Sequence, residues 1–273
     1  DASSVIDRNL NFSKNTYNVE ELYGKFLKTV ERSILDNEYE NEIAISLSGY
    51  VGWVNGSYNP NKGVDSKKSN IDNLVEVNPK LSYFSIMEKI VEPNDYNVDF
   101  FIHTWNDNRK DELNKLYQPK SIVAEPQDPF DKGELDDFGI KYRNGMRHNN
   151  RFRCYSKFNA TYKVLKLVRE YELKNDFKYD VVLTTRLDVI YNSVLNFSDY
   201  DLNKLWIGDW HIRGGVSTKE RFNDIIYFSN SDIMNGYVTE YKNINKFSQD
   251  NPYRNDLPTD PHYLFRLYSE AIT

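Results

Sequence analysis

Short, largely apolar segments alternate with segments of helical periodicity along this chain, and no other feature restricts its fold as strongly. A segment such as 42–49, bounded by polar residues, is typical of a strand buried on both faces of a sheet. Strands separated by helices form a mostly parallel sheet covered by helices on both sides. We therefore predict one α/β domain with a mostly parallel mixed sheet. The predicted strands are 42–49, 98–105, 120–125, 179–188, 205–208 and 224–228.

Helical patterns fill most of the intervals between these strands. In the first of them, Leu22, Phe26 and Val30 recur at helical spacing behind a capping box that starts at Asn18. We expect residues 1–41 to form an N-terminal helical region and 42–273 to form the core. The loops 50–80 and 126–150 show no periodicity, and long loops of this kind are commonly functional or disordered. The predicted helices are 18–36, 81–91, 109–117, 154–174, 231–246 and 260–272.

Composition narrows the class of protein. The 273 residues suit one large α/β domain, and the net charge of −6 disfavours a protein that mainly wraps nucleic-acid phosphate. No apolar run approaches the roughly 18–20 residues that cross a bilayer, so we expect no transmembrane segment. The single cysteine permits no internal disulfide and fits a reducing, cytoplasmic location. Because the sequence begins at Asp1 and ends within a helical pattern, we expect it to be part of a longer chain.

The ends of the first two long strands carry candidate binding residues, because ligands of open α/β sheets lie at the carboxyl ends of the strands. Ser48 and Gly49 end the first, where a glycine lets backbone amides approach a ligand or simply permits a turn. Near the end of the second, His103 could bond a phosphate or a hydroxyl, and Trp105 could stack on a ring. The alternative is a satisfied histidine with the tryptophan packed at the edge of the core. The sequence contains no dinucleotide-binding glycine fingerprint, P-loop, nucleophile elbow or H-E-x-x-H pair.

The fourth strand ends with a charged pair. Period-two alternation places Arg186 and Asp188 on one face at the mouth of the sheet. An aspartate offers a hard oxygen ligand to Mg²⁺ or Mn²⁺, and an arginine offers a fork that matches a diphosphate. The alternative is an internal salt bridge that closes the strand.

Further candidates lie beyond this strand. Asp209 and His211 precede two glycines, in a segment that could close over a substrate or be an ordinary connection. Either side chain could take a proton from an acceptor hydroxyl, as could Asp224 at the start of the next strand.

Four of these segments, taken in order, resemble GT-A-type glycosyltransferases encoded by viruses and by bacterial polysaccharide clusters. In that group a strand ending in Ser-Gly precedes an Asp-x-Phe-Ile-His-x-Trp strand, and Arg-x-Asp stands in place of the usual Asp-x-Asp motif. The resemblance implies a GT-A, Rossmann-like fold and a nucleotide-sugar donor whose diphosphate is bridged by Mn²⁺ or Mg²⁺. It rests on residues 43–49, 98–105, 179–188 and 224–234.

The resemblance also implies roles for individual residues. Asp188 would be the metal ligand or contact the donor ribose and sugar, and Arg186 would orient it or meet the diphosphate. Ser48 and Gly49 would approach the nucleoside. The donor pocket would be lined by His103 and Trp105.

The reaction implied is sugar transfer from a nucleotide sugar to a glycan or another hydroxyl acceptor, as in polysaccharide biosynthesis or the glycosylation of a virion. An inverting enzyme needs a proton acceptor, and the candidates are Asp209, His211 and Asp224. A retaining enzyme needs none. Two alternatives remain open. The first is an inactive nucleotide- or carbohydrate-binding module, which the missing first Asp of Asp-x-Asp favours, and the second is a structural domain that binds no nucleotide.

Overall fold

The computed structural model describes residues 41–54, 74–76, 78–127, 148–208, 223–239, 265–266, 269–270 and 272. All of them belong to one compact unit, Glu40–Thr273. The side chains of 52–54, 74–76 and 148–154 are not included in this description. The helix predicted over 18–36 lies outside the described residues, and so do Asp209 and His211.

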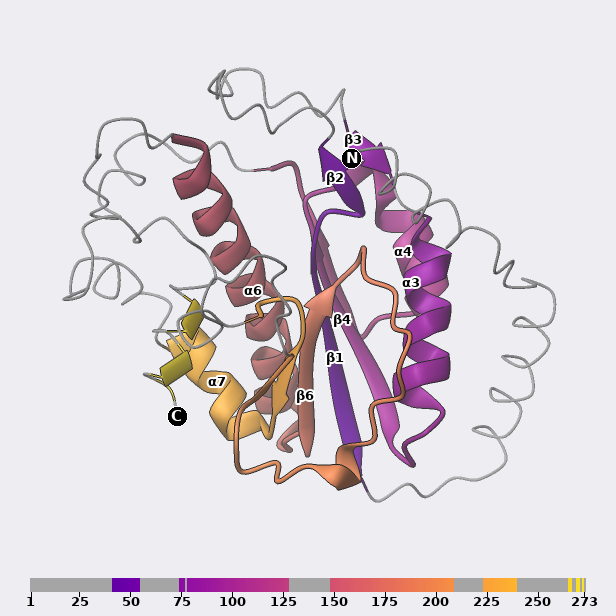
Figure 1. Ribbon diagram of the computed structural model, residues 1–273, viewed down its shortest axis with the longest axis vertical. Helices are drawn as coiled ribbons and strands as arrows, with labels where there is room; N and C mark the ends of the chain where they lie inside the picture. Colours follow the sequence, from indigo (N-terminus) through magenta and orange to yellow (C-terminus); the bar gives the residue numbers. More distant parts are fainter. Residues whose placement is uncertain are drawn as a thin grey trace, which may run out of the picture. The chain divides into compact units, whose positions relative to one another are not determined.

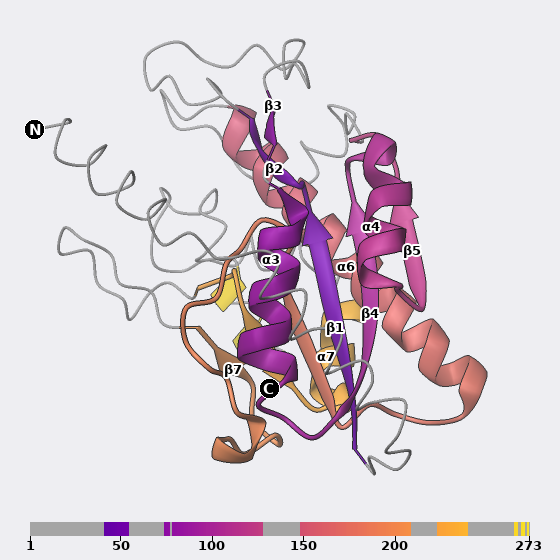
Figure 2. The ribbon, with the colours of Figure 1, turned by 90° about the vertical axis from the view of Figure 1, so that its right-hand side faces the viewer.

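Six strands form the main sheet, in the order β5-β4-β1-β6-β8-β7 (Figures 1 and 2). The first four in this order run parallel to one another, and β8 runs antiparallel to both of its neighbours, β6 and β7. The predicted mostly parallel mixed sheet is therefore confirmed. The strands are β1 (Glu42–Gly49), β4 (Asn97–Thr104), β5 (Ser121–Ala124), β6 (Val181–Arg186), β7 (Trp206–Ile207) and β8 (Tyr227–Ser229).

Helices cover both faces of this sheet, as the apolar strands predict. Figures 1 and 2 show α6 (His148–Asn175) and α7 (Ser231–Thr239) on one side, and α3 (Pro79–Ile86) and α4 (Lys110–Tyr117) on the other. On the α6 side, Ala44 and Phe101 belong to one apolar cluster with Val164. Neighbouring residues along each strand point to opposite faces, so both faces of β1 are buried.

An edge-to-face aromatic group packs beneath α3 and α4. The ring of Tyr117 lies 5.0 Å from that of Tyr83 and 5.3 Å from that of Phe100, measured between centroids. All three side chains are buried. Aromatic pairs prefer this geometry because the positive edge of one ring faces the negative face of the next.

The loop 50–80 is more structured than its sequence predicts. Its two ends contain β2 (Gly52–Val54) and β3 (Leu74–Glu76), which pair antiparallel in a separate two-stranded sheet. Three-residue strands are too short to produce a period-two pattern, so the prediction of a structureless loop was wrong at both ends. The helix predicted over 81–91 begins earlier, at Pro79, and continues from α3 into a π-helical segment, η3 (Met87–Val91).

Other predicted boundaries also move. The helix predicted over 154–174 corresponds to the longer α6, and the strand predicted to end at Asp188 stops at Arg186, so Asp188 lies in the turn that follows β6. Asp224 does not open a strand, because β8 starts three residues later. In both cases the pairing between strands, rather than the polarity of the local sequence, decides where the strand ends or begins. Of the last two predicted helices, α7 confirms the first as far as Thr239, and the described residues of 260–272 are helical.

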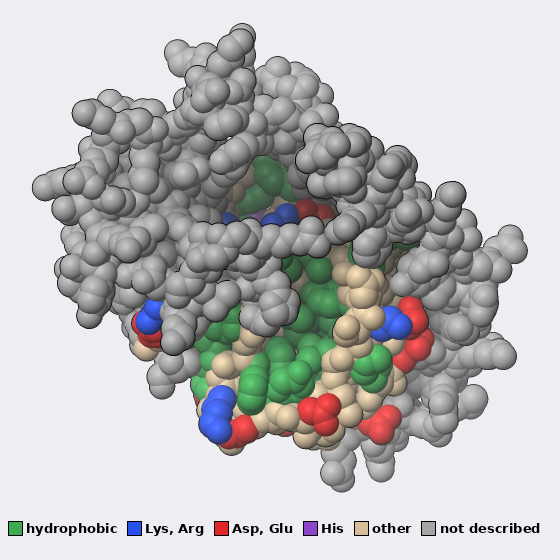
Figure 3. Space-filling view, in the orientation of Figure 1, with side chains coloured by type: hydrophobic (Ala, Val, Ile, Leu, Met, Phe, Trp, Pro, Cys, Tyr) green, Lys and Arg blue, Asp and Glu red, His purple; other side chains and the backbone are tan. Residues whose placement is uncertain are grey.

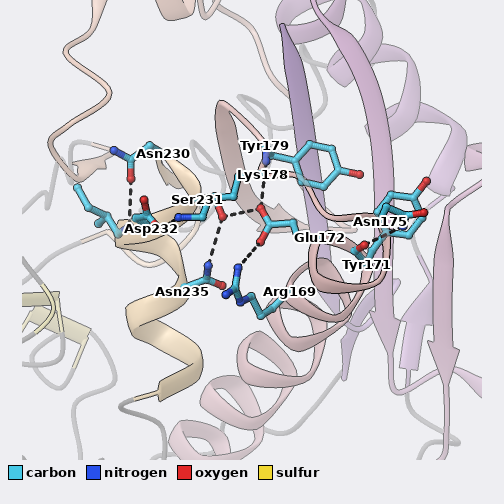
Figure 4. A network of polar contacts seen from close by, with 11 residues as sticks. Arg169, Tyr171, Glu172, Asn175, Lys178, Tyr179, Asn230, Ser231, Asp232 and Asn235 are labelled. Atoms are coloured by element: carbon cyan, nitrogen blue, oxygen red, sulfur yellow. Dashed lines mark hydrogen bonds and ion pairs between the residues drawn. The ribbon is translucent and has the colours of Figure 1, made fainter.

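A buried carboxylate fixes the far end of α6, opposite the carboxyl ends of the parallel strands. Glu172 is 1% exposed and accepts hydrogen bonds from Ser231 Oγ and, at 3.1 Å, from the backbone N–H of Tyr179 (Figure 4). Arg169 pairs with its other oxygen at 3.3 Å. Asn230 caps α7 next to this network, since its Oδ1 accepts from the N–H of Ile233. The network joins α6 to the beginnings of β6 and α7.

Candidate active site at the carboxyl edge of the sheet

Three predicted site residues occupy equivalent positions on three neighbouring strands. Ser48 of β1 is the register partner of His103 in β4 and of Arg186 in β6. Side chains of register partners in parallel strands point to the same face. Ala44, four residues before Ser48 in β1, packs in the cluster that contains residues of α6, so this is the α6 face. The fold thus brings residues more than 130 positions apart to one edge.

Gly49 ends β1 in a conformation that other residues rarely adopt. Its φ is +101°, and a Cβ placed on it would meet no atom of the described residues within 4 Å. The backbone angle rather than a lack of space therefore calls for glycine. Two residues later the N–H of Val51 donates to Asn106 Oδ1 at 2.9 Å, which ties the end of β1 to the segment after β4. The described contacts support the turn interpretation of Gly49.

Arg186 and Asp188 form a bidentate ion pair. Arg186 donates from Nε to Oδ1 of Asp188 at 2.7 Å and from one terminal nitrogen to Oδ2 at 2.5 Å. The arginine side chain is 44% exposed and the aspartate side chain 7%. Burial lowers the pKa of Arg186, but the hydrogen bonds and charge of Asp188, with the charge of Asp224, outweigh it and raise that pKa. The salt-bridge alternative describes this pair, and its exposed guanidinium still faces solvent.

Asp224 is also paired. Its side chain is 6% exposed, and its carboxylate pairs with Lys157 of α6, which also donates to the backbone carbonyl of Asp224. Its charge acts on Arg186, so Asp224 belongs to the same region of the molecule. A carboxylate at Asp224 that takes a proton from an acceptor hydroxyl would therefore already have its negative charge balanced by Lys157.

Besides the pairs at Arg186 and Asp224, a further group of charged side chains lies around His103. The ring is fully buried, and its Nε2 lies 3.0 Å from Oε1 of Glu125. Lys163 of α6 pairs with the same oxygen, and its Nζ lies 4.8 Å from the centre of the Trp105 ring. Burial lowers the pKa of His103, only partly opposed by its hydrogen bond to Glu125. Burial alone would raise the pKa of Glu125, but the bonds from His103 and Lys163 outweigh it and lower that pKa.

Trp105 packs as a core residue. It is 3% exposed and lies against Ala160 of α6, with Tyr50 and Tyr155 packed around the pair. The ring of His103 meets it edge-on at 4.5 Å. The described contacts therefore match the core-packing alternative, and Trp105 positions His103 and Lys163.

Sequence reasoning missed Glu125 and Lys163. Glu125 ends the predicted strand 120–125, so the criterion that selected the other strand ends could also have selected it. No local signal marks Lys163, because its importance depends on how α6 packs against the sheet.

The site has balanced charge and lies in a hollow. Figure 3 shows a hollow in which basic, acidic and histidine side chains lie together beside apolar ones. Each carboxylate described above has a cationic partner. The pairs are Arg186 with Asp188, Lys157 with Asp224, and Lys163 with Glu125. The charges described at this edge are therefore paired within the protein.

Asp188 is the residue of this edge that fits a divalent cation best. In the described part of the chain no three His, Cys, Asp or Glu side chains are grouped as in an all-protein metal site. Asp188 offers a carboxylate, the kind of ligand that Mg²⁺ and Mn²⁺ prefer, at the edge where a ligand would lie. It therefore fits as one protein ligand if a bound diphosphate and water supply the others.

No family model matches the chain, and no curated protein matches it either. Among the helices that the structure describes, none is long and apolar enough to cross a membrane.

Proposed function

We propose that this chain is a GT-A-type glycosyltransferase that moves a sugar from a nucleotide-sugar donor to a glycan or another hydroxyl acceptor. One observation carries the proposal, namely that Ser48, His103 and Arg186 lie in register at the carboxyl edge of the sheet. The four segments that resemble these enzymes also correspond to four neighbouring elements of the sheet, in the order β4-β1-β6-β8.

The proposed mechanism follows from the charges at this edge. Arg186 would stabilise the negative charge that develops on the leaving diphosphate, which is the largest electrostatic contribution in transfers of this type. Asp188 orients the guanidinium through its two hydrogen bonds. In an inverting reaction a carboxylate or histidine takes the proton of the acceptor hydroxyl. Asp224, Asp209 and His211 stay the candidates, and the last two lie outside the described residues.

A divalent cation, Mn²⁺ or Mg²⁺, is part of the proposal. Asp188 would hold it, and Arg186 would then give up at least one carboxylate oxygen. When bound, such a cation neutralises the diphosphate.

An inactive binding module of the same fold is the second candidate. It is favoured by the pairing of Asp188 with Arg186 and of Asp224 with Lys157, since both carboxylates are already engaged. Such a module would bind nucleotide or sugar without transferring it.

A thermal-shift panel of nucleotides and nucleotide sugars, with and without Mn²⁺, tests the proposal. A ligand that binds only the folded protein raises Tm. We expect a selective shift that Mn²⁺ strengthens, that is lost in Asp188→Asn, and that is kept in the control Asp201→Asn, whose exposed carboxylate pairs with Lys204. Transfer of a labelled sugar to an acceptor would then separate the enzyme from the binding module. The absence of any shift at high ligand concentration would overturn both.

A further inference from the structure

One ring nitrogen of His103 lacks a hydrogen-bond partner within the described part of the chain. Its side chain is 0% exposed, and Nδ1 has no hydrogen bond among the described residues. Buried polar atoms in folded proteins are nearly always hydrogen-bonded, so an exception calls for an explanation. The other ring nitrogen, Nε2, is bonded to Glu125. The ring is therefore held at Nε2, while Nδ1 is buried with no hydrogen-bond partner among the described residues.

The bond to Glu125 fixes which nitrogen carries the proton. An ionised carboxylate only accepts hydrogen bonds, so Nε2 must be the donor. Lys163 binds the same oxygen of Glu125 and balances its negative charge. A neutral imidazole has a single N–H, and Nδ1 therefore presents a lone pair.

A lone pair at Nδ1 selects the chemistry of its partner. It accepts a hydrogen bond from a hydroxyl or an N–H group and cannot bond an ionised phosphate oxygen, which is itself an acceptor. Of the two partners that the sequence suggests for His103, a hydroxyl or a phosphate, this geometry favours the hydroxyl.

Further polar side chains lie near His103 on the same face of the sheet. Ser48, its register partner in β1, is 8% exposed and lies beside it on the α6 face. Ser46 lies on the same face one step deeper, and its Oγ also has no hydrogen bond among the residues described. Arg186 is the register partner of Ser48 on the other side. A ligand whose anionic part lies at Arg186 would therefore have its neighbouring hydroxyl groups near His103.

We propose that His103 accepts a hydrogen bond from a hydroxyl of a bound sugar or ribose, and that Glu125 and Lys163 are positioning residues that fix its tautomer. The inference rests on the proposed function, since a nucleotide sugar carries such hydroxyls on both sides of its diphosphate. It adds to that function the choice of a hydroxyl over a phosphate at His103, and a positioning role for Glu125 and Lys163.

The first experiment measures the tautomer in the ligand-free protein. With ¹⁵N-labelled histidine, the ring resonances of His103 are assigned by replacing the other three histidines one at a time, so His103 itself stays in place. We expect a neutral ring with the proton on Nε2 in the native protein at pH 7.5. Glu125→Ala should weaken this preference toward the mixture of tautomers of a free neutral imidazole, whereas Glu170→Ala, at an exposed position of α6, should leave it unchanged. A proton on Nδ1 in the native protein would overturn the proposal.

The second experiment adds ligands. The probes are UDP-glucose and GDP-mannose, each beside analogues that lack one ribose or sugar hydroxyl. We expect one parent compound to move the Nδ1 resonance, and one analogue of it to bind about tenfold more weakly to the native protein. In Glu125→Ala the difference in binding between the parent and that analogue should be smaller.

The outcomes distinguish this proposal from the proposed function. A probe that raises Tm but leaves the Nδ1 resonance unmoved overturns the assignment of His103 alone. If neither these probes nor any member of the thermal-shift panel raises Tm or moves the resonance, the glycosyltransferase proposal fails and the hydroxyl contact fails with it.

Discussion

Arg186 donates two hydrogen bonds to Asp188 across a single residue, from Nε to Oδ1 at 2.7 Å and from a terminal nitrogen to Oδ2 at 2.5 Å. The pair forms because β6 stops at Arg186 and the chain turns at once, with Leu187 fully buried between the two charged residues. The carboxylate is nearly covered and the guanidinium is half exposed. Asp188 thus holds in place the positively charged side chain of Arg186, which can contact a ligand.

Asp188→Asn should destabilise the fold modestly. The substitution leaves Arg186 without its counter-charge, but the arginine side chain is 44% exposed and water screens the loss, so we expect a cost of about 1 kcal/mol. Urea denaturation measures it. Asp201→Asn, the control at an exposed pair, should leave the free energy of unfolding nearly unchanged. Equal effects of the two substitutions would contradict the structural importance of the Arg186 pair.

Glu172→Gln should lower the free energy of unfolding more than Asp188→Asn does, although Glu172 lies far from the candidate site. The carboxylate is fully buried and accepts from Ser231, Tyr179 and Arg169, so an amide at this position presents a donor where acceptors are needed. We expect a loss of roughly 2–4 kcal/mol in the free energy of unfolding. Glu170→Gln, two residues away on the exposed face of α6, should stay within about 0.5 kcal/mol of the native protein. A small effect of Glu172→Gln would show that the network in Figure 4 is dispensable.

Gly49→Ala tests the backbone conformation at the end of β1. No atom of the residues that the structure describes would clash with the added methyl group, so the cost should come from the positive φ and amount to about 1–2 kcal/mol. Gly49→Val should cost more than Gly49→Asn, because asparagine tolerates positive φ better than β-branched residues do. Denaturation of the three variants gives the ranking, and equal costs would point to a cause other than backbone strain.

His103 should make stability depend on pH near neutrality. Its pKa in the folded protein lies below the ordinary value of 6.5, chiefly because the ring is buried among groups that include Glu125 and Lys163. Below about pH 6.5 the unfolded chain therefore binds more protons than the folded one, and stability falls as the pH falls. The contribution of Glu125 changes only at lower pH, since its folded pKa lies below 4.5.

Urea denaturation at pH 7.5 and pH 5.5 measures this effect. The native protein should lose more stability between the two values than His103→Gln does, by at most about 1.4 kcal/mol per pH unit for a single proton. An identical loss in both proteins would mean that the ring is not held neutral by burial.

The sequence alone determined the order and type of the main elements. Uninterrupted apolar runs and helical spacing are local properties, and they predicted β1, β4, β5 and β6 and the helices between them. The same patterns placed Ser48, His103 and Arg186 at strand ends, where a parallel sheet gathers ligand-binding side chains.

The tertiary structure decided which of these ends meet and what surrounds them. The register that aligns Ser48 with His103 and Arg186 comes from hydrogen bonds between strands that are distant in sequence. Lys163 reaches Glu125 only because α6 packs against the sheet. Neither relationship has a local periodic signal, because side-chain patterns record which face is buried and leave open which partner covers it. Folding therefore brought residues that were predicted separately at strand ends together at one edge of the sheet, within two groups of charged side chains.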